Sequence, residues 1–158
     1  MRRFTIAFIA ATSILTSVSA SALTAKQSVE KEIVVQMPDG TESLTRGPAE
    51  LVTPGERVVY TLSYTNDDAA PATDLVLTMP VPSEIKYMDE SATLDGAKVV
   101  YSADDGKTFS SRAALRVVGL DGNVRTARSE DITHIRWTVA GPLAVGETGT
   151  LSYKGVLK

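Results

Sequence analysis

The chain has 158 residues, with 19 Asp and Glu against 16 Lys and Arg, one His and no Cys. The absence of Cys excludes disulfides, thiol catalysis and thiolate metal sites. The acidic balance, without any run of basic residues after the first few positions, argues against nucleic acids and anionic lipids as partners, because clustered Lys and Arg bind both.

The first 22 residues have the pattern of a secretory signal peptide. Two arginines at positions 2 and 3 precede an apolar stretch that ends near residue 18, and Ala20-Ser21-Ala22 offers a small-x-small cleavage site. Cleavage after Ala20 fits nearly as well. The alternative is a membrane anchor, but the apolar stretch is shorter than the roughly 20 residues that span a bilayer. We expect export to the periplasm, the cell surface or the medium of a bacterium, without membrane insertion after cleavage.

The exported part, residues 23–158, suits a single domain. Four of its first six residues, 23–28, are polar, and we expect this segment to form a mobile arm. Residues 29–37 are predicted to form a strand that ends at the turn Pro38-Asp39-Gly40, and residues 42–44 can pair back across that turn.

Residues 23–36 form a longer arm that carries the sharpest functional idea, because its extended apolar end can complete the sheet of a neighbouring molecule. Ile33, Val34 and Val35 form that candidate strand-donor segment. The alternative is that the segment pairs within its own domain. Glu30, Lys31 and Glu32 precede it and would guard against uncontrolled pairing.

Two neighbouring runs then alternate apolar and polar residues with the period of a half-buried strand. The first covers residues 57–65, after Pro54-Gly55, and the second covers residues 73–79 and ends at Pro80. Proline cannot donate to a strand ladder, so it terminates the second run. Together the two runs predict adjacent strands of an antiparallel sheet that has one face buried.

Further short strands are predicted at residues 85–88, 99–102, 115–118, 132–139 and 149–157, and at most one helical turn at 126–131. Gly155 interrupts the inward face of the last strand, which indicates a bulge or a close backbone approach. Seven to nine short strands at this spacing predict an all-β fold, an immunoglobulin-like antiparallel β-sandwich. The side chains expected to anchor its core are Tyr60, Leu62, Leu75, Leu77, Ile135, Trp137 and Tyr153.

Several of these features, at this spacing, resemble a bacterial surface-protein repeat family catalogued as domain of unknown function 11. They are Pro54-Gly55, a strand ending at Asn66, Pro71-Ala72-Thr73, Pro82 and Tyr87. The closing segment THIRWTVAGPLAVGETGTLSYKGVLK is also similar to the end of such domains. The resemblance implies an immunoglobulin-like sandwich on an envelope or secreted protein, without known catalysis. The family is often arranged in tandem, whereas this chain carries one copy.

One local motif, S-x-D-x-G-x-T-aromatic, matches the Asp-box hairpin turn. Its residues are Ser102, Asp104, Gly106, Thr108 and Phe109. In such a turn the Ser and Asp side chains bond to nearby backbone groups, and the Gly supplies a positive φ. The resemblance to sialidase propellers concerns a turn that lies away from their active site. We therefore interpret this single copy as a structural turn.

The remaining polar residues do not converge on a recognisable catalytic or metal-binding pattern. His134 is the only histidine and is expected on the solvent face, without a nucleophile or an orienting group beside it. Acidic residues gather near two loops, where the alternative to solvated carboxylates is a calcium site with six or more converging oxygens. These residues are Asp67, Asp68, Asp74, Asp121, Glu130 and Asp131.

An intramolecular isopeptide bond would need an Asn on the last strand opposite Lys31, and that strand has none. We therefore predict no enzymatic activity, no cofactor and no metal. The sequence favours a non-catalytic envelope or extracellular structural module that contacts proteins, or copies of itself, through sheet edges. The alternative is a subunit of an extracellular filament assembled by strand donation from the N-terminal arm.

Overall fold

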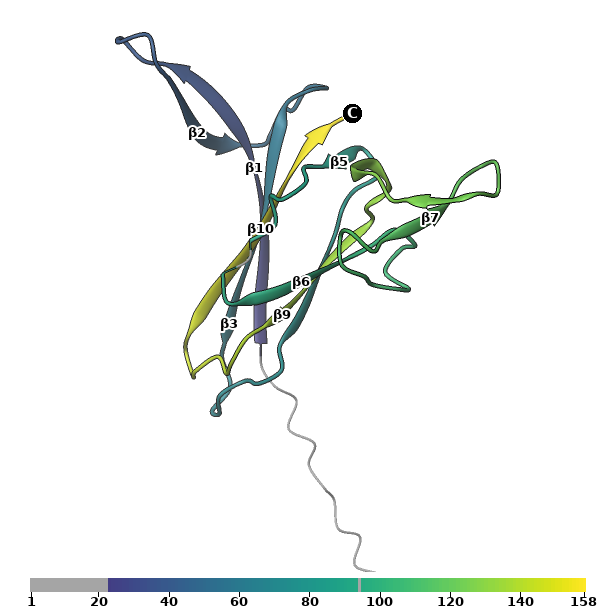
Figure 1. The fold of residues 1–158 in the computed structure, drawn as a ribbon. Coiled ribbons are helices and arrows are strands. Elements are labelled where there is room, and N and C mark those ends of the chain that lie inside the picture. Colours follow the sequence, from purple (N-terminus) through teal and green to yellow (C-terminus); the bar gives the residue numbers. More distant parts are fainter. Residues whose placement is uncertain (1–22, 94) are drawn as a thin grey trace, which may run out of the picture.

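The structure, a computed structural model, describes residues 23–93 and 95–158, so the predicted signal peptide lies outside the described residues. These residues form antiparallel sheets packed as a sandwich, which confirms the predicted all-β fold (Figure 1). The larger sheet has five strands in the order β2-β1-β3-β10-β5. Their bounds are β1 Leu23–Gln36, β2 Glu42–Pro48, β3 Arg57–Asn66, β5 Ile85–Tyr87 and β10 Thr148–Leu157.

The smaller sheet has three strands in the order β4-β9-β6, and a separate two-stranded hairpin, β7-β8, extends from one side of the sandwich (Figure 1). A short 3₁₀ turn, η1, links this hairpin to β9. Their bounds are β4 Val76–Pro80, β6 Ala97–Ser102, β7 Arg116–Val118, β8 Val124–Thr126, η1 Ser129–Asp131 and β9 His134–Val139.

The N-terminal segment is not the mobile arm that we expected. Residues 23–31 pair with β3 in an antiparallel register that runs from Leu23 opposite Asn66 to Lys31 opposite Val58. Leu23 also packs against the core. The polar composition of residues 24–28 is explained by their exposure on an outer strand, since an edge strand can keep its ladder while most of its side chains face water.

The described residues form ten strands, against the seven to nine expected, and the difference lies mainly in β8. Residues 124–126 lack an alternating apolar pattern, yet they pair with β7 across the turn at Gly122, whose φ is +78°. The predicted strand at residues 73–79 begins later, at Val76, because Asp74 has a φ of +53° and cannot lie in a strand. The single helical turn expected within 126–131 is η1.

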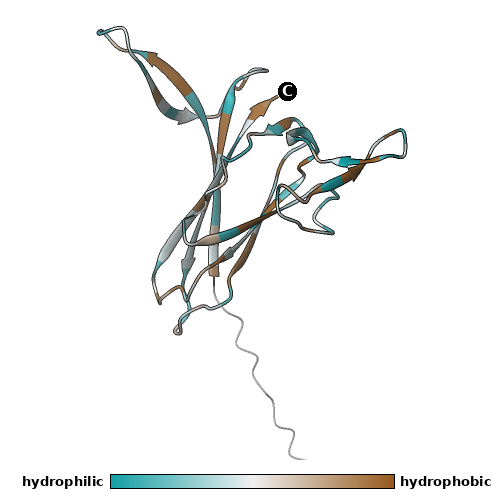
Figure 2. Ribbon diagram, in the orientation of Figure 1, coloured by the Kyte–Doolittle hydropathy of each residue, from teal (hydrophilic) through white to brown (hydrophobic). Residues whose placement is uncertain are grey.

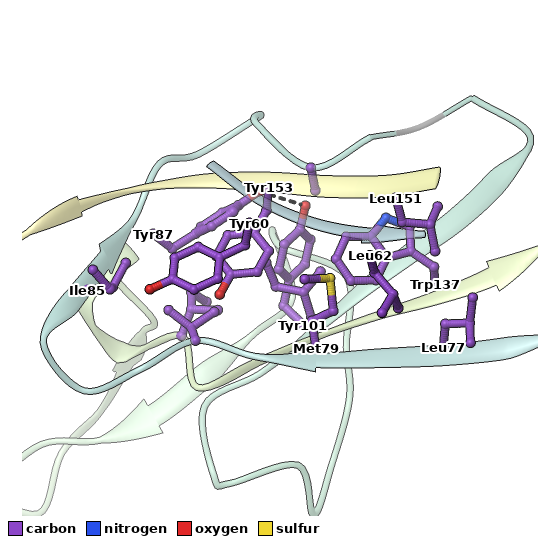
Figure 3. Packing of buried hydrophobic residues seen from close by; sticks show 14 of the residues in the cluster. Tyr60, Leu62, Leu77, Met79, Ile85, Tyr87, Tyr101, Trp137, Leu151 and Tyr153 are labelled. Carbon is purple, nitrogen blue, oxygen red and sulfur yellow. Dashed lines mark hydrogen bonds between the residues drawn. The ribbon is translucent and has the colours of Figure 1, made fainter. Parts of the chain in front are cut away.

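The core lies between the two sheets and is rich in aromatic side chains (Figure 3). Trp137 is fully buried, and its indole N–H donates to the Thr93 carbonyl at 2.9 Å. Tyr60 and Tyr153 stack with ring centroids 4.9 Å apart. Burial raises the pKa of the Tyr153 hydroxyl well above its ordinary value, and that hydroxyl donates to the Pro80 carbonyl. The stacked rings thus join β3 and β10 of the larger sheet, and the Tyr153 hydroxyl reaches β4 of the smaller sheet.

The other expected core residues also lie in this cluster. Leu62, Leu77 and Ile135 are buried within it, and Leu75 is half-buried against it. Gly155 shows the close approach that the sequence indicates, because a Cβ at this position would meet the Ile85 side chain and the carbonyl of Lys86 on β5.

Candidate interaction surface

The most distinctive feature of the surface is the β1–β2 hairpin, which projects away from the body of the sandwich (Figure 1). β1 pairs with β3 only as far as Lys31, whereas its pairing with β2 continues to Gln36. β3 begins at Arg57, whose guanidinium lies near Glu32, so no residue of that strand lies opposite residues 33–36. The second half of β1 therefore depends on β2 alone for its ladder.

This hairpin exposes a group of large apolar side chains, and its hydrophobic residues colour parts of the projecting ribbon brown (Figure 2). Val34 and Leu44 face each other across the two strands and are 54% and 56% exposed. Ile33 and Val35 lie on the opposite face, and Met37 lies at the turn; all three are also exposed. Two faces of one hairpin thus present apolar area, which is typical of an interaction site rather than of a solvated loop.

The outer edge of β2 also presents backbone groups. Met37 N–H donates to the Thr41 carbonyl at the hairpin end. Opposed residues of an antiparallel pair are alternately hydrogen-bonded and not hydrogen-bonded to each other, so this bond fixes which residues of β2 bond to β1. In that alternation Glu42, Leu44 and Arg46 direct their N–H and C=O groups away from β1. Within residues 23–93 and 95–158, no strand pairs with this edge. The hairpin therefore combines apolar side chains with open hydrogen-bonding positions.

A groove of about 670 Å³ lies where the hairpin leaves the body, lined by residues of β1, β2 and the start of β3. Glu32 lines it, and this side chain is only 5% exposed. One carboxylate oxygen accepts a hydrogen bond from Lys154 Nζ. The other has no hydrogen-bond partner among the described residues and lies 3.9 Å from Arg57 Nη1. These charges tie the base of the hairpin to β3 and β10.

Lys31, considered above for an isopeptide bond, has a different role in the structure. Its Nζ donates to the Leu51 carbonyl at 3.1 Å and lies 3.7 Å from Glu56. The strand-donor candidates Ile33, Val34 and Val35 lie in the projecting half of β1, paired with β2.

The Asp-box residues form a tight turn between β6 and the following segment. The buried Ser102 hydroxyl donates to Asp104 Oδ1 at 2.7 Å and accepts from Gly106 N–H at 2.9 Å. Asp104 also accepts from the Thr108 backbone at 2.9 Å and from its hydroxyl at 2.6 Å. The Phe109 ring lies 3.5 Å below the Arg136 guanidinium, a cation–π contact with β9. The turn thus has a structural role, because its hydrogen bonds start at the end of β6 and its Phe109 ring contacts β9.

Replacing Asp104 by Asn is expected to remove an acid-sensitive part of the stability. Hydrogen bonds from Thr108, and then from Ser102, hold the pKa of Asp104 well below its ordinary value of 3.8. The unfolded chain therefore binds this proton more readily, so the contribution is present above about pH 4 and is lost as the pH falls further. Asp104→Asn should be less stable than the wild type at pH 7, and the difference should shrink in acid.

Urea unfolding followed at pH 7 and in steps down to about pH 2 measures this difference. The matched control is Asp105→Asn, since the Asp105 carboxylate takes no part in the network, although its backbone N–H donates to Thr133 Oγ1. A constant difference between Asp104→Asn and the wild type across the pH range would contradict the assignment.

His134 differs from its expected place in solvent. The imidazole is half-buried against Gly106 of the Asp-box turn, because a Cβ at that glycine would lie 3.5 Å from the ring. Its Nδ1 lies 3.3 Å from Thr133 Oγ1. The side chain therefore helps to seat the turn on β9.

One of the loop carboxylates, Asp131, is engaged in an ion pair rather than solvated, and Asp89 forms a second ion pair. Asp131 receives two hydrogen bonds from the Arg125 guanidinium, at 2.6 and 2.9 Å, and these lower the pKa of the carboxyl. Asp89 likewise accepts from Arg112 Nε at 2.6 Å and from the Ser129 hydroxyl. The Arg112 contact, the largest of several, lowers the pKa of Asp89.

The Asp89–Arg112 pair borders a second hollow of about 740 Å³ beside Tyr101. The Asp89 carboxylate is already occupied by donors, so it holds the adjacent segments together and is poorly placed to accept a substrate proton.

Within the described ranges, no three His, Asp or Glu side chains gather closely enough to hold a metal ion. No helix formed by the described residues has the length and apolar character needed to cross a bilayer.

Sequence reasoning missed one residue that organises the opposite end of the sandwich. Asn66, at the end of β3, is fully buried, and its Nδ2 donates to the carbonyls of Ala70 and Leu143, each at 2.9 Å. Its Oδ1 accepts from Asp68 N–H. The only signal in the sequence was its place after an alternating run, which reads as an ordinary turn residue.

Comparisons with known proteins leave the family open: no family model, no curated protein and no solved structure matches this chain. The resemblance to the bacterial surface-protein repeat stays a prediction.

Proposed function

We propose that this protein is a non-catalytic, exported structural module of the cell envelope or the extracellular space, and that it contacts protein partners through the β1–β2 hairpin. The observation that carries the proposal is the projection of a paired hairpin whose five apolar side chains are exposed and whose outer edge is unpaired within the described ranges. Backbone edges supply affinity for another strand, and alternate side chains supply specificity.

The arrangement of charges supports a fixed presentation of this hairpin. Glu32 at its base bridges to Lys154 of β10, and Arg46 Nη1 on β2 lies 3.9 Å from Glu30 of β1. A hairpin of two strands is marginally stable alone in water. Here its β1 strand continues into the ladder with β3, so the body of the sandwich holds the hairpin in place.

Filament assembly by donation of the N-terminal arm is less well supported. Residues 23–31 form nine residue pairs with β3 of the same chain, and donation to a neighbour would require all of them to separate. We therefore place the contact on the projecting half of the hairpin and not on residues 23–31.

Site-specific photo-crosslinking in cells tests the proposal. A benzophenone side chain is introduced at Val34 on the hairpin, or at Lys98, an exposed control position on β6. We expect position 34 to form a discrete protein adduct in the envelope or extracellular fraction, and position 98 to form none. Equal labelling from both positions, or no adduct from either, would overturn the assignment of the hairpin.

N-terminal sequencing of the fractionated protein tests export, with Leu23 or Ser21 expected as the first residue.

A further inference from the structure

We propose that the outer edge of β2 is self-complementary and that the partner of this hairpin is a second copy of the same chain, paired antiparallel about a two-fold axis at Leu44. The inference rests on the proposed function and deepens it by naming the partner. It joins two five-stranded sheets into one continuous sheet through β2 of each molecule. The register of β2, its charges and its apolar residues each support this pairing.

The backbone of β2 is correctly phased for this pairing. Glu42, Leu44 and Arg46 direct their N–H and C=O groups to the outer edge, as the hydrogen bond from Met37 to Thr41 and the β1–β2 register require. A two-fold axis at Leu44 makes Leu44 and its copy a hydrogen-bonded pair, with each N–H donating to the other carbonyl. Glu42 and Arg46 then form two further hydrogen-bonded pairs with their opposite numbers. Pro48, which has no N–H, lies outside this paired window.

Charge complementarity selects this register. The axis at Leu44 places Glu42 of one molecule opposite Arg46 of the second, and the same pair forms again by symmetry. Opposite charges directly across an antiparallel pair stabilise it, and like charges destabilise it. A shift of the axis by one residue along β2 in either direction loses both pairs. The edge thus carries opposite charges at equal distances from one central apolar residue, which an isologous interface requires.

The apolar residues fit the same axis. Val34 and Leu44 are opposite one another on one face of the hairpin, and both are more than half exposed. Dimerisation extends this pair to a row of four side chains across four strands, Val34 and Leu44 of each molecule. The row removes apolar surface from water at the centre of the new sheet. A different protein that adds a strand here is the competing occupant, and the tests below distinguish it from a second copy.

Cysteine crosslinking reads the register directly, because the chain has no Cys of its own. In the proposed dimer the two Cα atoms at position 44 lie about 5.5 Å apart, within the range of a disulfide. Leu44→Cys should form a covalent dimer under mild oxidation of the purified protein. Ser43→Cys is the matched control: it faces position 45 of the second copy, so its own counterpart is too distant. Equal crosslinking of both variants, or of neither, would overturn the register.

Charge reversal supplies an independent test by sedimentation velocity over a concentration series. Glu42→Arg alone and Arg46→Glu alone each create two like-charge pairs, and each should weaken self-association by about tenfold or more. Mixing the two single variants restores both opposite-charge pairs and should recover the wild-type dimer, as should the double reversal E42R/R46E. Circular dichroism of each variant checks that the fold is intact.

A wild-type protein that stays monomeric at every concentration, or single reversals that leave self-association unchanged, would overturn the dimer. Either result leaves the proposed function standing if Val34 still crosslinks to a different protein in cells. Loss of the Val34 adduct together with a persistent dimer through position 44 would overturn the role of the hairpin in cells, and not the dimer.

Discussion

Replacing Trp137 by Ala is expected to lower the free energy of unfolding by about 3–5 kcal/mol, the range observed when a large buried aromatic is truncated. The indole is fully buried between the sheets, and its N–H satisfies the Thr93 carbonyl. The substitution leaves a cavity among β3, β9 and β10 and removes the donor to that carbonyl. Because domains of this size are stable by only about 5–15 kcal/mol, the loss is a large share of the total.

Urea unfolding followed by far-ultraviolet circular dichroism measures this effect, since Trp137 is the only tryptophan and its fluorescence disappears in the variant. Trp137→Phe is the control, because it retains most of the buried area and loses the hydrogen bond. We expect its cost to be about 1–3 kcal/mol. An Ala variant as stable as the Phe variant would show that the ring does not fill the space between the sheets.

Replacing Asn66 by Asp is expected to be the second large effect, and it should depend on pH. The Asn66 amide donates to the carbonyls of Ala70 and Leu143. A carboxylate there would place negative charge against two carbonyl oxygens in a buried site, so the pKa of the introduced Asp should be raised. The destabilisation should then be greatest above that pKa, about 3 kcal/mol or more at pH 7, and smaller in acid, where the carboxyl is protonated.

Asn66→Ala separates the two causes, because it loses the hydrogen bonds without adding charge. We expect a loss of about 2–4 kcal/mol that does not change with pH. Asn123→Asp is the matched surface control: Asn123 is exposed and its amide donates only to Asp121 within its own turn. Urea unfolding at pH 7 compares the two losses in free energy of unfolding. If Asn66→Asp lost no more than Asn123→Asp, the hydrogen bonds from Asn66 to Ala70 and Leu143 would not hold the two loops together.

The sheet architecture could be predicted because alternation and turns are local properties of the sequence. Residues 57–65 alternate with period two, and β3 covers Arg57–Asn66. Pro38-Asp39-Gly40 and Asp121-Gly122-Asn123 both mark turns, with positive φ at Gly40 and Gly122. These signals depend on neighbouring residues alone, so they can be recognised without knowing the tertiary contacts of the segment.

The N-terminal segment shows where local reasoning ends. Residues 24–28 carry no alternating apolar pattern, yet they form a strand because β3 offers hydrogen-bonding partners along its whole length. In the same way, β8 exists because β7 lies beside it. A strand's ladder partner can be distant in sequence, and nothing in the strand's own residues need reveal it.

The candidate surface could be predicted in part. The sequence marks Ile33, Val34 and Val35 as an apolar segment suited to strand pairing, and they lie on the projecting hairpin. Their partner strand and their exposure depend on where β3 begins, which the composition of the hairpin does not reveal. The opposite charges of Glu42 and Arg46 suggest an interface only after the hydrogen-bonding pattern of the β1–β2 ladder is known. That pattern shows that the backbone groups of both residues face the outer edge of β2.

By itself the sequence determined that this chain alternates in short strands, turns at Pro, Gly and Asn, and buries one indole. The tertiary structure alone decided that the N-terminal segment completes the large sheet, that Asn66 joins two loops, and that the β1–β2 hairpin extends beyond β3. The physical reason is that side-chain periodicity depends only on residues that are adjacent in the sequence. The neighbours of a strand, and the edges left without one, follow from contacts between residues far apart along the chain.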